Sequence, residues 1–283
     1  MKFIYLVVFI LSIQAGSAQN KLELPFIEHL IDKQYYDEVI HLIDNDLGNY
    51  REGQQQDSLN FYKGWAYYSL KNLDQSTISF LKVGKESPFY LKSRFFAGYN
   101  QTFLENYDEA RKIFSQINGS DETNLSLVNF EICGISMLQK DWLKAKVQLQ
   151  QLNPNIASIN QQFTALGQIN NEQAKHRSKS PLLAGIMSGI IPGSGKIYAG
   201  KTGQGIASMI ATTGFGLIAW ENYRKLGIGH FKTIFFGSIF AANYVSNIYG
   251  SVISIRIIEN EYQDAIHNQI LFQLHIPLRN FFE

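Results

Sequence analysis

The chain has 283 residues, which is enough for one large domain or two smaller ones. Its formal net charge of +1 excludes a protein that holds nucleic acid through a general basic field. The single cysteine, Cys133, excludes an intrachain disulfide, and its apolar setting in NFEICGISML predicts a buried packing residue rather than a nucleophile. Charged residues are common up to Lys179 and scarce from Pro181 to Ser254, which predicts two regions of different character.

The first twenty residues, MKFIYLVVFILSIQAGSAQN, have the pattern of a secretory signal peptide. Lys2 supplies the positive charge, Phe3 to Ile13 are apolar, and Gly16 to Ala18 are small. We expect cleavage after Ala18, so that residues 1–18 are removed. The alternative is an uncleaved anchor helix, which the short apolar stretch disfavours. The pattern predicts a protein of the bacterial cell envelope.

Residues 20–155 are predicted to form an array of helical hairpins, because a pattern recurs about every 34 residues. Segments that begin at Phe61, Phe95 and Phe130 align with one another. The aligned positions hold a small residue in the first helix (Gly64, Gly98, Gly134), a small residue in the second (Ser76, Ala110, Ala145) and a large apolar residue (Phe80, Phe114, Leu149). We expect the small residues to let the two helices of a hairpin approach closely.

This pattern resembles the tetratricopeptide repeat, with PFIEHLIDKQYYDEVIHLID as a divergent first unit. The family's tryptophan at the fourth position is absent from every unit, and the turn of the third is one residue short. Another array of helical hairpins is the alternative. The resemblance implies a superhelix with a concave face lined by the first helices.

Aligned with the family, two units would present aromatic side chains on that concave face. The candidate partner-binding residues are Phe61, Trp65, Tyr68, Phe95 and Tyr99. An exposed row of such side chains would form a groove for a protein partner. The alternative is that these aromatics pack between the units.

Residues 156–180 are predicted to form a linker helix, residues 181–256 a membrane-associated helical domain, and residues 257–283 a C-terminal tail. Within the membrane domain, Gly203–Trp220 and Thr233–Ser254 are predicted to form a transmembrane hairpin. Small residues four apart would let these helices pack closely: Ser208, Thr212 and Gly216, then Gly237 and Ala241. Asn243 and Asn247 are expected to face the neighbouring helix rather than to mark a permeation path. A hydrophobic hairpin outside the membrane is the alternative.

The stretch GKIYAGKT, from Gly195 to Thr202, fits the P-loop pattern G-x-x-x-x-G-K-[ST]. A nucleotide site also needs a preceding buried strand and a distant magnesium-binding aspartate. The only later aspartate, Asp264, has a polar setting, and Ile197 and Tyr198 are bulky where the loop must wrap phosphate. We therefore expect no bound nucleotide and no cofactor.

The longer stretch IIPGSGKIYAGKTGQG resembles the P-G-x-G-x-x-Y-x-G-x-x-x-x-G turn of small bacterial membrane domains with two transmembrane helices, and of a bacteroidete family of unknown function. The matching positions are Pro192, Gly193, Gly195, Tyr198, Gly200 and Gly205. The later NIYG, which begins at Asn247, resembles a feature of chains that join a tetratricopeptide array to this segment. The resemblance implies a tight turn at the membrane surface with Tyr198 at the interface, and supplies no activity.

The sequence as a whole predicts an all-α protein without a catalytic constellation, and its six histidines show no metal-site spacing. We expect a non-enzymatic, membrane-anchored adaptor or scaffold, with the array in the periplasm and the bilayer and a protein as its partners. The basic loop with Arg224, Lys225 and Lys232 fits a cytoplasmic connection between two inner-membrane spans, and a third span that includes Pro181 to Ile191 is the alternative. The alternatives are a small transport or channel component, a nucleotide enzyme, and a soluble periplasmic scaffold.

Overall fold

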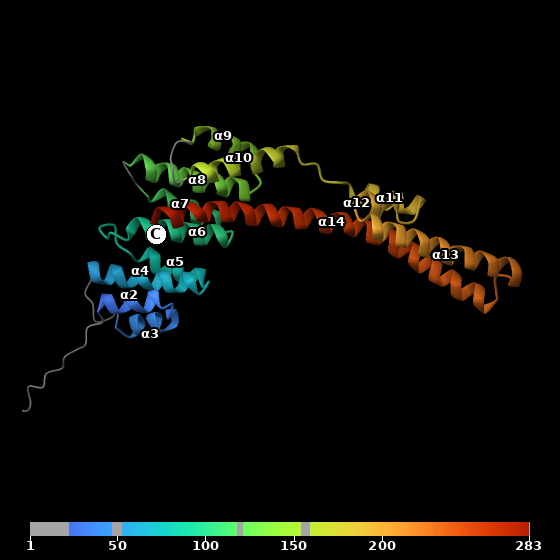
Figure 1. Ribbon diagram of the computed structural model, residues 1–283, viewed down its shortest axis with the longest axis horizontal. Helices are drawn as coiled ribbons and strands as arrows, with labels where there is room; N and C mark the ends of the chain where they lie inside the picture. Colours follow the sequence, from blue (N-terminus) through green and yellow to red (C-terminus); the bar gives the residue numbers. More distant parts are fainter. Residues whose placement is uncertain (1–22, 47–52, 118–120, 154–158, 283) are drawn as a thin grey trace, which may run out of the picture. The chain divides into compact units, whose positions relative to one another are not determined.

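The computed structural model describes residues 23–46, 53–117, 121–153 and 159–282, and in this part of the chain it contains helices and no strand (Figure 1). The predicted all-α class is confirmed. The expected signal peptide lies outside the described residues. The chain divides into two compact units, residues 1–167 with 271–283, and residues 168–270. The boundary between the units, at residues 167 and 168, lies within the expected linker helix of residues 156–180. The expected C-terminal tail, residues 257–283, belongs to α14 as far as the structure describes it.

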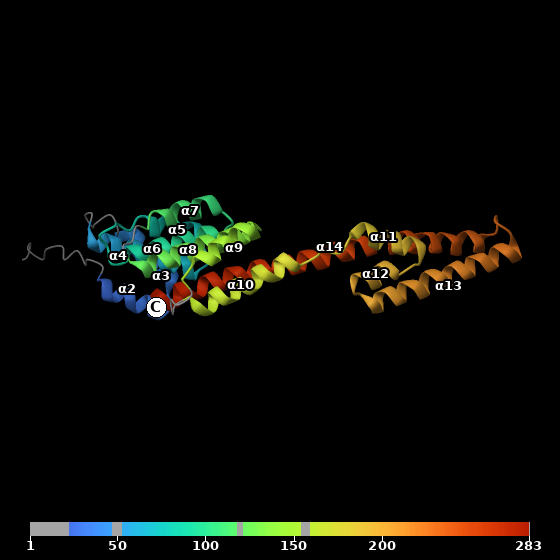
Figure 2. The ribbon, with the colours of Figure 1, turned by 90° about the horizontal axis from the view of Figure 1, so that it is seen from above.

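The first unit consists of helical hairpins joined in series, and they lie side by side in two views (Figures 1 and 2). Its helices are α2 (Leu24–Asp32), α3 (Tyr36–Asp46), α4 (Gln54–Ser69), α5 (Leu73–Leu81), α6 (Tyr90–Phe103), α7 (Tyr107–Ser115), α8 (Glu122–Leu138) and α9 (Trp142–Gln151). The first part of α10 (Asn160–Lys175) and the last twelve residues of α14 (Phe231–Phe282) complete it. Its largest fully buried side chains are Phe80, Phe95, Phe96, Phe114 and Phe130.

Short polar side chains begin several of these helices. Asn72 accepts a hydrogen bond from the backbone N–H of Gln75 at the start of α5, and Asp141 accepts one from Lys144 at the start of α9. Such caps satisfy backbone donors that have no partner within the helix. The sequence therefore marks the start of α5 and of α9 locally.

The turns inside the four described hairpins share one backbone geometry. Each contains a left-handed residue that is not glycine, with φ of 62° or 63°: Gln34, Lys71, Glu105 and Lys140. In the second hairpin, the N–H of Lys71 bonds to the carbonyl of Tyr68 and the next N–H bonds to that of Tyr67, and the other turns repeat this pair. These are the two bonds of the Schellman motif, which satisfy carbonyls at the end of the first helix.

Close approach of paired helices is confirmed at two of the three aligned glycines. A Cβ atom at Gly64 would lie 2.5 Å from the ring of Phe80, and one at Gly98 would lie 2.5 Å from the ring of Phe114. Gly134 differs, because a Cβ there would first meet Leu274 of α14, at 2.3 Å. The third glycine therefore makes room for the end of α14.

The second unit contains α11 (Pro181–Ile190), α12 (Ser194–Ala199), α13 (Thr202–Leu226), the last part of α10 and residues 231–270 of α14. The predicted glycine-rich turn, from Pro192 to Gly205, packs α11, α12 and α13 against one another. Gly193 is left-handed, with φ of 89°, and a Cβ there would lie 2.1 Å from the carbonyl oxygen of Gly205. A Cβ at Gly195 would lie 2.0 Å from the carbonyl oxygen of Ala184. Both positions require glycine because backbone fills the space of a side chain.

Within the described residues, no helix combines the length and the apolar character needed to cross a membrane. The expected spans at 203–220 and 233–254 lie in α13 and α14, and neither helix meets this requirement. Glycine, serine, threonine and asparagine are frequent among their apolar residues and lower the mean hydropathy.

Candidate functional site

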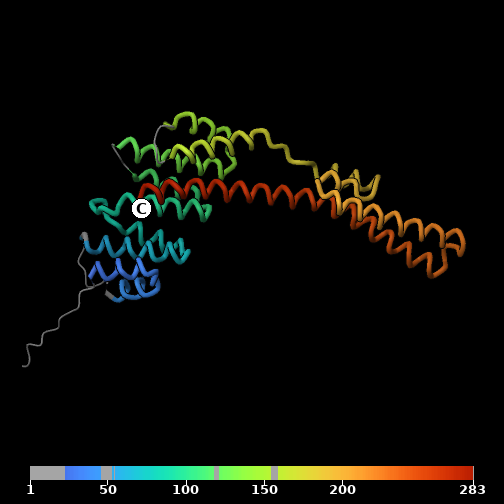
Figure 3. The backbone as a smooth tube through the Cα atoms, viewed as in Figure 1, coloured from blue at the N-terminus to red at the C-terminus, as the bar shows by residue number. Residues whose placement is uncertain are grey.

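In the first unit, residues 271–282 of α14, which we call the docked segment, lie against the first helices of the hairpins (Figure 3). We call this surface the A-helix face. It is defined by Trp65 and Tyr68 of α4, by Lys92, Phe95, Phe96 and Tyr99 of α6, and by Gly134 of α8. The site is therefore built from three hairpins and one helix that is distant in sequence.

Two tyrosines of the A-helix face hold the first part of the docked segment. The Tyr68 hydroxyl is 2.5 Å from Nε2 of His275, and the Tyr99 ring stacks on the His275 ring with centroids 5.0 Å apart. The Tyr99 hydroxyl also donates to the backbone carbonyl of Leu271, at 3.4 Å. Burial raises the pKa of Tyr99 well above its ordinary value, so this hydroxyl remains a donor at neutral pH.

A lysine and two phenylalanines hold the other end of the docked segment. Lys92 donates from Nζ to the backbone carbonyl of Phe282, at 3.0 Å, and the same Nζ lies 4.6 Å from the centroid of the Trp65 ring. The Phe282 ring lies 5.4 Å from that of Phe95 and 6.4 Å from that of Phe96. Lys92 thus combines a cation–π contact with a hydrogen bond to a carbonyl at a helix end, where carbonyls lack intrahelical partners.

The docked segment presents an apolar stripe to this face. Leu271, Leu274 and Leu278 are at most 5% exposed, and their spacing of three and four residues places them on one side of a helix. Arg279 and Asn280 are exposed, and so is Phe272, at 61%. The segment is therefore an amphipathic helix.

Beside the site, α8 buries a carboxyl group. Glu131 has no exposed surface, and neither of its carboxyl oxygens has a hydrogen-bond partner among the described residues. Burial raises its pKa well above the ordinary value, because it disfavours the charged form of the carboxyl. Glu131 also contributes, after burial and Tyr68, to the raised pKa of Tyr99.

The five aromatic residues predicted to line a partner groove divide into two groups. Tyr68, Phe95 and Tyr99 contact the docked segment, and Trp65 lies beneath Lys92. Phe61 is buried inside the array and stacks on Phe89 with centroids 4.3 Å apart, as the packing alternative predicted. Because Phe61, Tyr68, Phe95 and Tyr99 are buried and Trp65 is half-buried, these residues do not form an exposed row in the described structure, and partner binding by them stays a prediction. His275 and Glu131 were not predicted as site residues, although the leucine spacing in ILFQLHIPL is visible in the sequence.

In the second unit, the two predicted intramembrane asparagines behave differently. Asn243 donates to the carbonyl of Ile239 in its own helix, at 2.9 Å. Asn247 is 3% exposed, and its side-chain amide has no hydrogen-bond partner among the described residues. Ser188 of α11 links α11 to two other helices. Its Oγ lies 2.7 Å from that of Ser251 in α14 and accepts a hydrogen bond from the N–H of Gly195 in α12.

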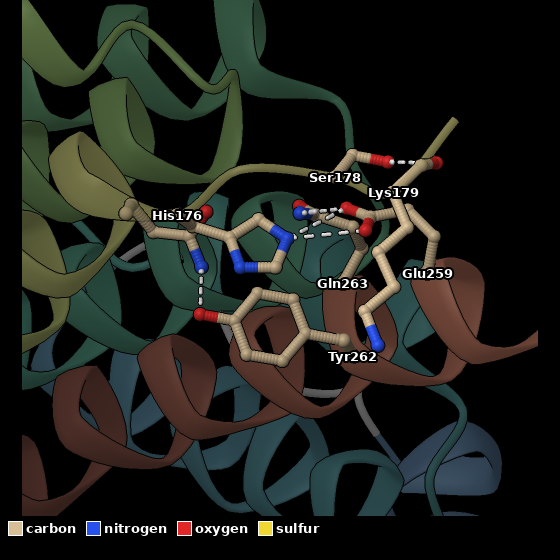
Figure 4. A network of polar contacts seen from close by, with 7 residues as sticks. His176, Ser178, Lys179, Glu259, Tyr262 and Gln263 are labelled. Atoms are coloured by element: carbon tan, nitrogen blue, oxygen red, sulfur yellow. Dashed lines mark hydrogen bonds and ion pairs between the residues drawn. The ribbon is translucent and has the colours of Figure 1, made fainter. Parts of the chain in front are cut away.

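Polar contacts tie the start of this unit to α14 (Figure 4). His176 Nε2 lies 3.1 Å from a carboxylate oxygen of Glu259, and the His176 ring stacks on Tyr262. Gln263 donates to the same carboxylate. Burial acts to raise the pKa of Glu259, but the hydrogen bonds from His176 and Gln263 outweigh it, so the pKa lies below the ordinary value.

The P-loop match does not have the geometry of a phosphate loop in the described structure. Residues 195–199 of the match are helical, and no described strand precedes them. Tyr198 lies beside the start of α11, where its hydroxyl accepts a hydrogen bond from the N–H of Ser180 and its backbone carbonyl accepts one from Lys179 Nζ. The described residues also contain no group of three histidine, cysteine or acidic side chains placed to hold a metal ion.

Comparison of the chain with protein-family models, with curated proteins and with solved structures gives no match. The resemblances to the tetratricopeptide repeat and to the two-helix membrane domains therefore stay predictions.

Proposed function

We propose that this chain is a membrane-associated helical-repeat adaptor, without enzymatic activity, whose hairpin array binds an amphipathic helix of a protein partner in the bacterial envelope. The observation that carries the proposal is the docked segment itself. The A-helix face already surrounds an amphipathic helix with aromatic rings, two tyrosine hydroxyls and a lysine. Helix-in-groove recognition reads anchors at this spacing.

The contacts indicate which features of a partner helix matter. Tyr99 and Lys92 bind backbone carbonyls, so these two hydrogen bonds accept any side chain at the positions of Leu271 and Phe282. The leucine stripe and the small space at Gly134 select apolar residues three and four apart. A partner is thus expected to share the pattern of the docked segment rather than its sequence.

The same surface cannot hold both helices, so a partner must exchange with the docked segment. The apparent affinity of the intact chain for a partner helix is then the intrinsic affinity multiplied by the fraction of molecules in which the segment is undocked. The four turns of equal geometry support the tetratricopeptide resemblance, and the sequence of residues 1–18 supports export to the periplasm.

The proposal is tested by fluorescence anisotropy with a labelled peptide of residues 266–282 and the full chain. Leu274→Glu places a charge in the apolar interface and is expected to release the docked segment, so peptide binding should tighten at least about tenfold. Phe272→Glu, on the exposed side, is the matched control and should bind like the natural chain.

His275→Ala keeps this test decisive if Leu274→Glu unfolds, because it removes the contacts with Tyr68 and Tyr99 without placing a charge in the interface, and it should tighten peptide binding several-fold. Lys92→Met added to whichever of the two variants folds removes a donor from the A-helix face and should weaken peptide binding several-fold. A peptide with serine at the three leucine positions should not bind. If no form of the chain binds the natural peptide, the A-helix face is a permanent structural contact and the proposal fails.

A further inference from the structure

A cluster of exposed apolar side chains lies where α13 turns into α14 in the second unit. Seven large residues between positions 220 and 235 are exposed in the described structure: Trp220, Tyr223, Leu226, Ile228, Phe231, Ile234 and Phe235. We call residues 220–235 the hairpin tip. Ile228 is 77% exposed and Phe231 is 74% exposed. Soluble monomers rarely expose a large contiguous apolar patch, so such a patch indicates a contact surface.

The tip is an ordered turn. Gly227 ends α13 in the left-handed region, with φ of 84°, and Thr233 Oγ donates to its carbonyl, at 2.9 Å. The ring centroids of Phe231 and Phe235 are 5.8 Å apart, as are those of Trp220 and Tyr223. A groove of about 620 Å³ opens between the two helices and is lined largely by apolar atoms. The apolar groups are therefore gathered on one structural element.

Basic side chains accompany this apolar cluster. The hairpin tip contains three basic side chains, Arg224, Lys225 and Lys232, and one carboxylate, Glu221. Its net charge is therefore +2 when His230 is neutral. Lys225 pairs with Glu221 at 2.6 Å, and the ion pairs of the described residues leave Arg224 and Lys232 without a carboxylate. Two cations thus remain available to an acidic surface.

We propose that the hairpin tip inserts its apolar side chains into the interfacial layer of a bilayer that contains anionic lipid, with Arg224 and Lys232 at the headgroups. Tryptophan and tyrosine favour the boundary between headgroups and acyl chains, and basic side chains add attraction to acidic headgroups. The charge and the aromatic residues together favour lipid over a protein surface. This inference rests on the membrane association in the proposed function and assigns it to one segment and one lipid class.

The test is flotation of the full chain with phosphatidylcholine vesicles, with and without phosphatidylglycerol. Ile228→Glu/Phe231→Glu should lower the bound fraction about tenfold, because two carboxylates must leave water to insert. Leu143→Glu is the matched control, since Leu143 of the first unit is also 77% exposed, and it should float like the natural chain. Arg224→Gln/Lys232→Gln should remove the preference for phosphatidylglycerol and the sensitivity to salt.

The depth of insertion gives a second readout that does not require a binding defect. In a chain with Trp65 and Trp142 replaced by phenylalanine, Trp220 fluorescence should be quenched most by lipids brominated near the headgroup. Quenching only by lipids brominated at the acyl-chain ends would indicate a deeper, spanning arrangement and would overturn interfacial insertion.

The outcomes separate this inference from the proposed function. If the natural chain floats and the tip variant floats equally well, the tip inference fails and membrane association stands. If the natural chain binds neither vesicle, both fail, while helix binding by the array is judged by its own peptide assay. If the tip variant instead abolishes self-association in light scattering without changing flotation, the tip is an interface between copies and the lipid inference fails.

Discussion

The two units differ in what their closely packed glycines contact and in how far their large apolar side chains are exposed. In the first unit, Gly64 and Gly98 face phenylalanine rings, and the large apolar side chains are buried. In the second unit, Gly193 and Gly195 face backbone carbonyls, and many large apolar side chains are exposed. A ring can shift to admit a methyl group, whereas a backbone carbonyl within two packed helices cannot. The first unit thus buries its largest apolar side chains in its own core, whereas the second unit exposes many of its large apolar side chains.

The largest expected effect is at the backbone contact of the second unit. Gly195→Ala would put Cβ 2.0 Å from the carbonyl oxygen of Ala184, so we expect a loss of about 3 kcal/mol or more from the overpacked contact. Gly203→Ala is the control, because no atom outside its own helix lies within 4 Å. Hydrogen exchange in α11 and α12 measures the difference. Equal protection in the two variants would show that the second unit is as adaptable as the first.

The next effect is at the contact between Gly134 and Leu274. Leu274→Ala removes a fully buried side chain and should cost about 3 kcal/mol in urea unfolding. Gly134→Ala should also destabilise the natural chain, but much less in the Leu274→Ala background, where its Cβ has room. Phe272→Ala is expected to change stability by less than about 0.5 kcal/mol. Strictly additive effects would contradict the contact.

The stability of the first unit is expected to depend on pH through the buried carboxyl of Glu131. The pKa of this carboxyl is raised on folding, so its contribution is fully present below the unfolded pKa of about 4.3 and is lost as the pH rises toward the folded pKa. Glu131→Gln should therefore match the natural chain near pH 4 and exceed its stability at pH 8, by about 1.4 kcal/mol for each unit by which folding raises the pKa within this range. Thermal unfolding across this range measures it, and parallel curves would refute the neutral buried form.

The smallest expected effect has the opposite sign and lies in the second unit. The pKa of Glu259 is lowered on folding, so its contribution is present above the unfolded pKa and is lost as the pH falls through the folded pKa. His176→Ala should raise the Glu259 pKa toward its ordinary value and cost about 0.5 kcal/mol or less, because the pair is partly exposed. Carboxyl NMR titration reports the shift, and Lys175→Ala serves as the neighbouring control. An unchanged Glu259 titration would remove His176 as the cause.

The sequence was sufficient for features that depend on local spacing. The repeat of about 34 residues located the hairpins, and the contacts of Gly64 and Gly98 follow from the aligned pattern. The glycines of the P-G-x-G turn also lie where backbones meet. These predictions succeed because each depends on residues that are close in sequence.

The docked segment could not be predicted in the same way. Its contacts join Tyr68 to His275 and Tyr99 to Leu271, and nothing local in either stretch indicates the other. The aromatic pattern on α4 and α6 was the same whether another protein or the chain's own helix would cover it. The expected spans lie in α13 and α14, where glycine, serine, threonine and asparagine interrupt the apolar residues, and neither helix has the length and apolar character to cross a membrane. The left-handed turn residues were missed because none of them is glycine.

The distance in sequence between the A-helix face and its docked segment has a consequence in time. Tyr99 and Leu271 are 172 residues apart, and a ribosome adds about 5–20 residues each second. The face is therefore complete on the order of ten seconds before its own covering helix has been synthesised. A partner helix that arrives during this interval meets no competitor, whereas one that arrives later must wait for the segment to leave. Under the proposed function, the order of arrival thus decides, together with affinity, which helix the array holds first.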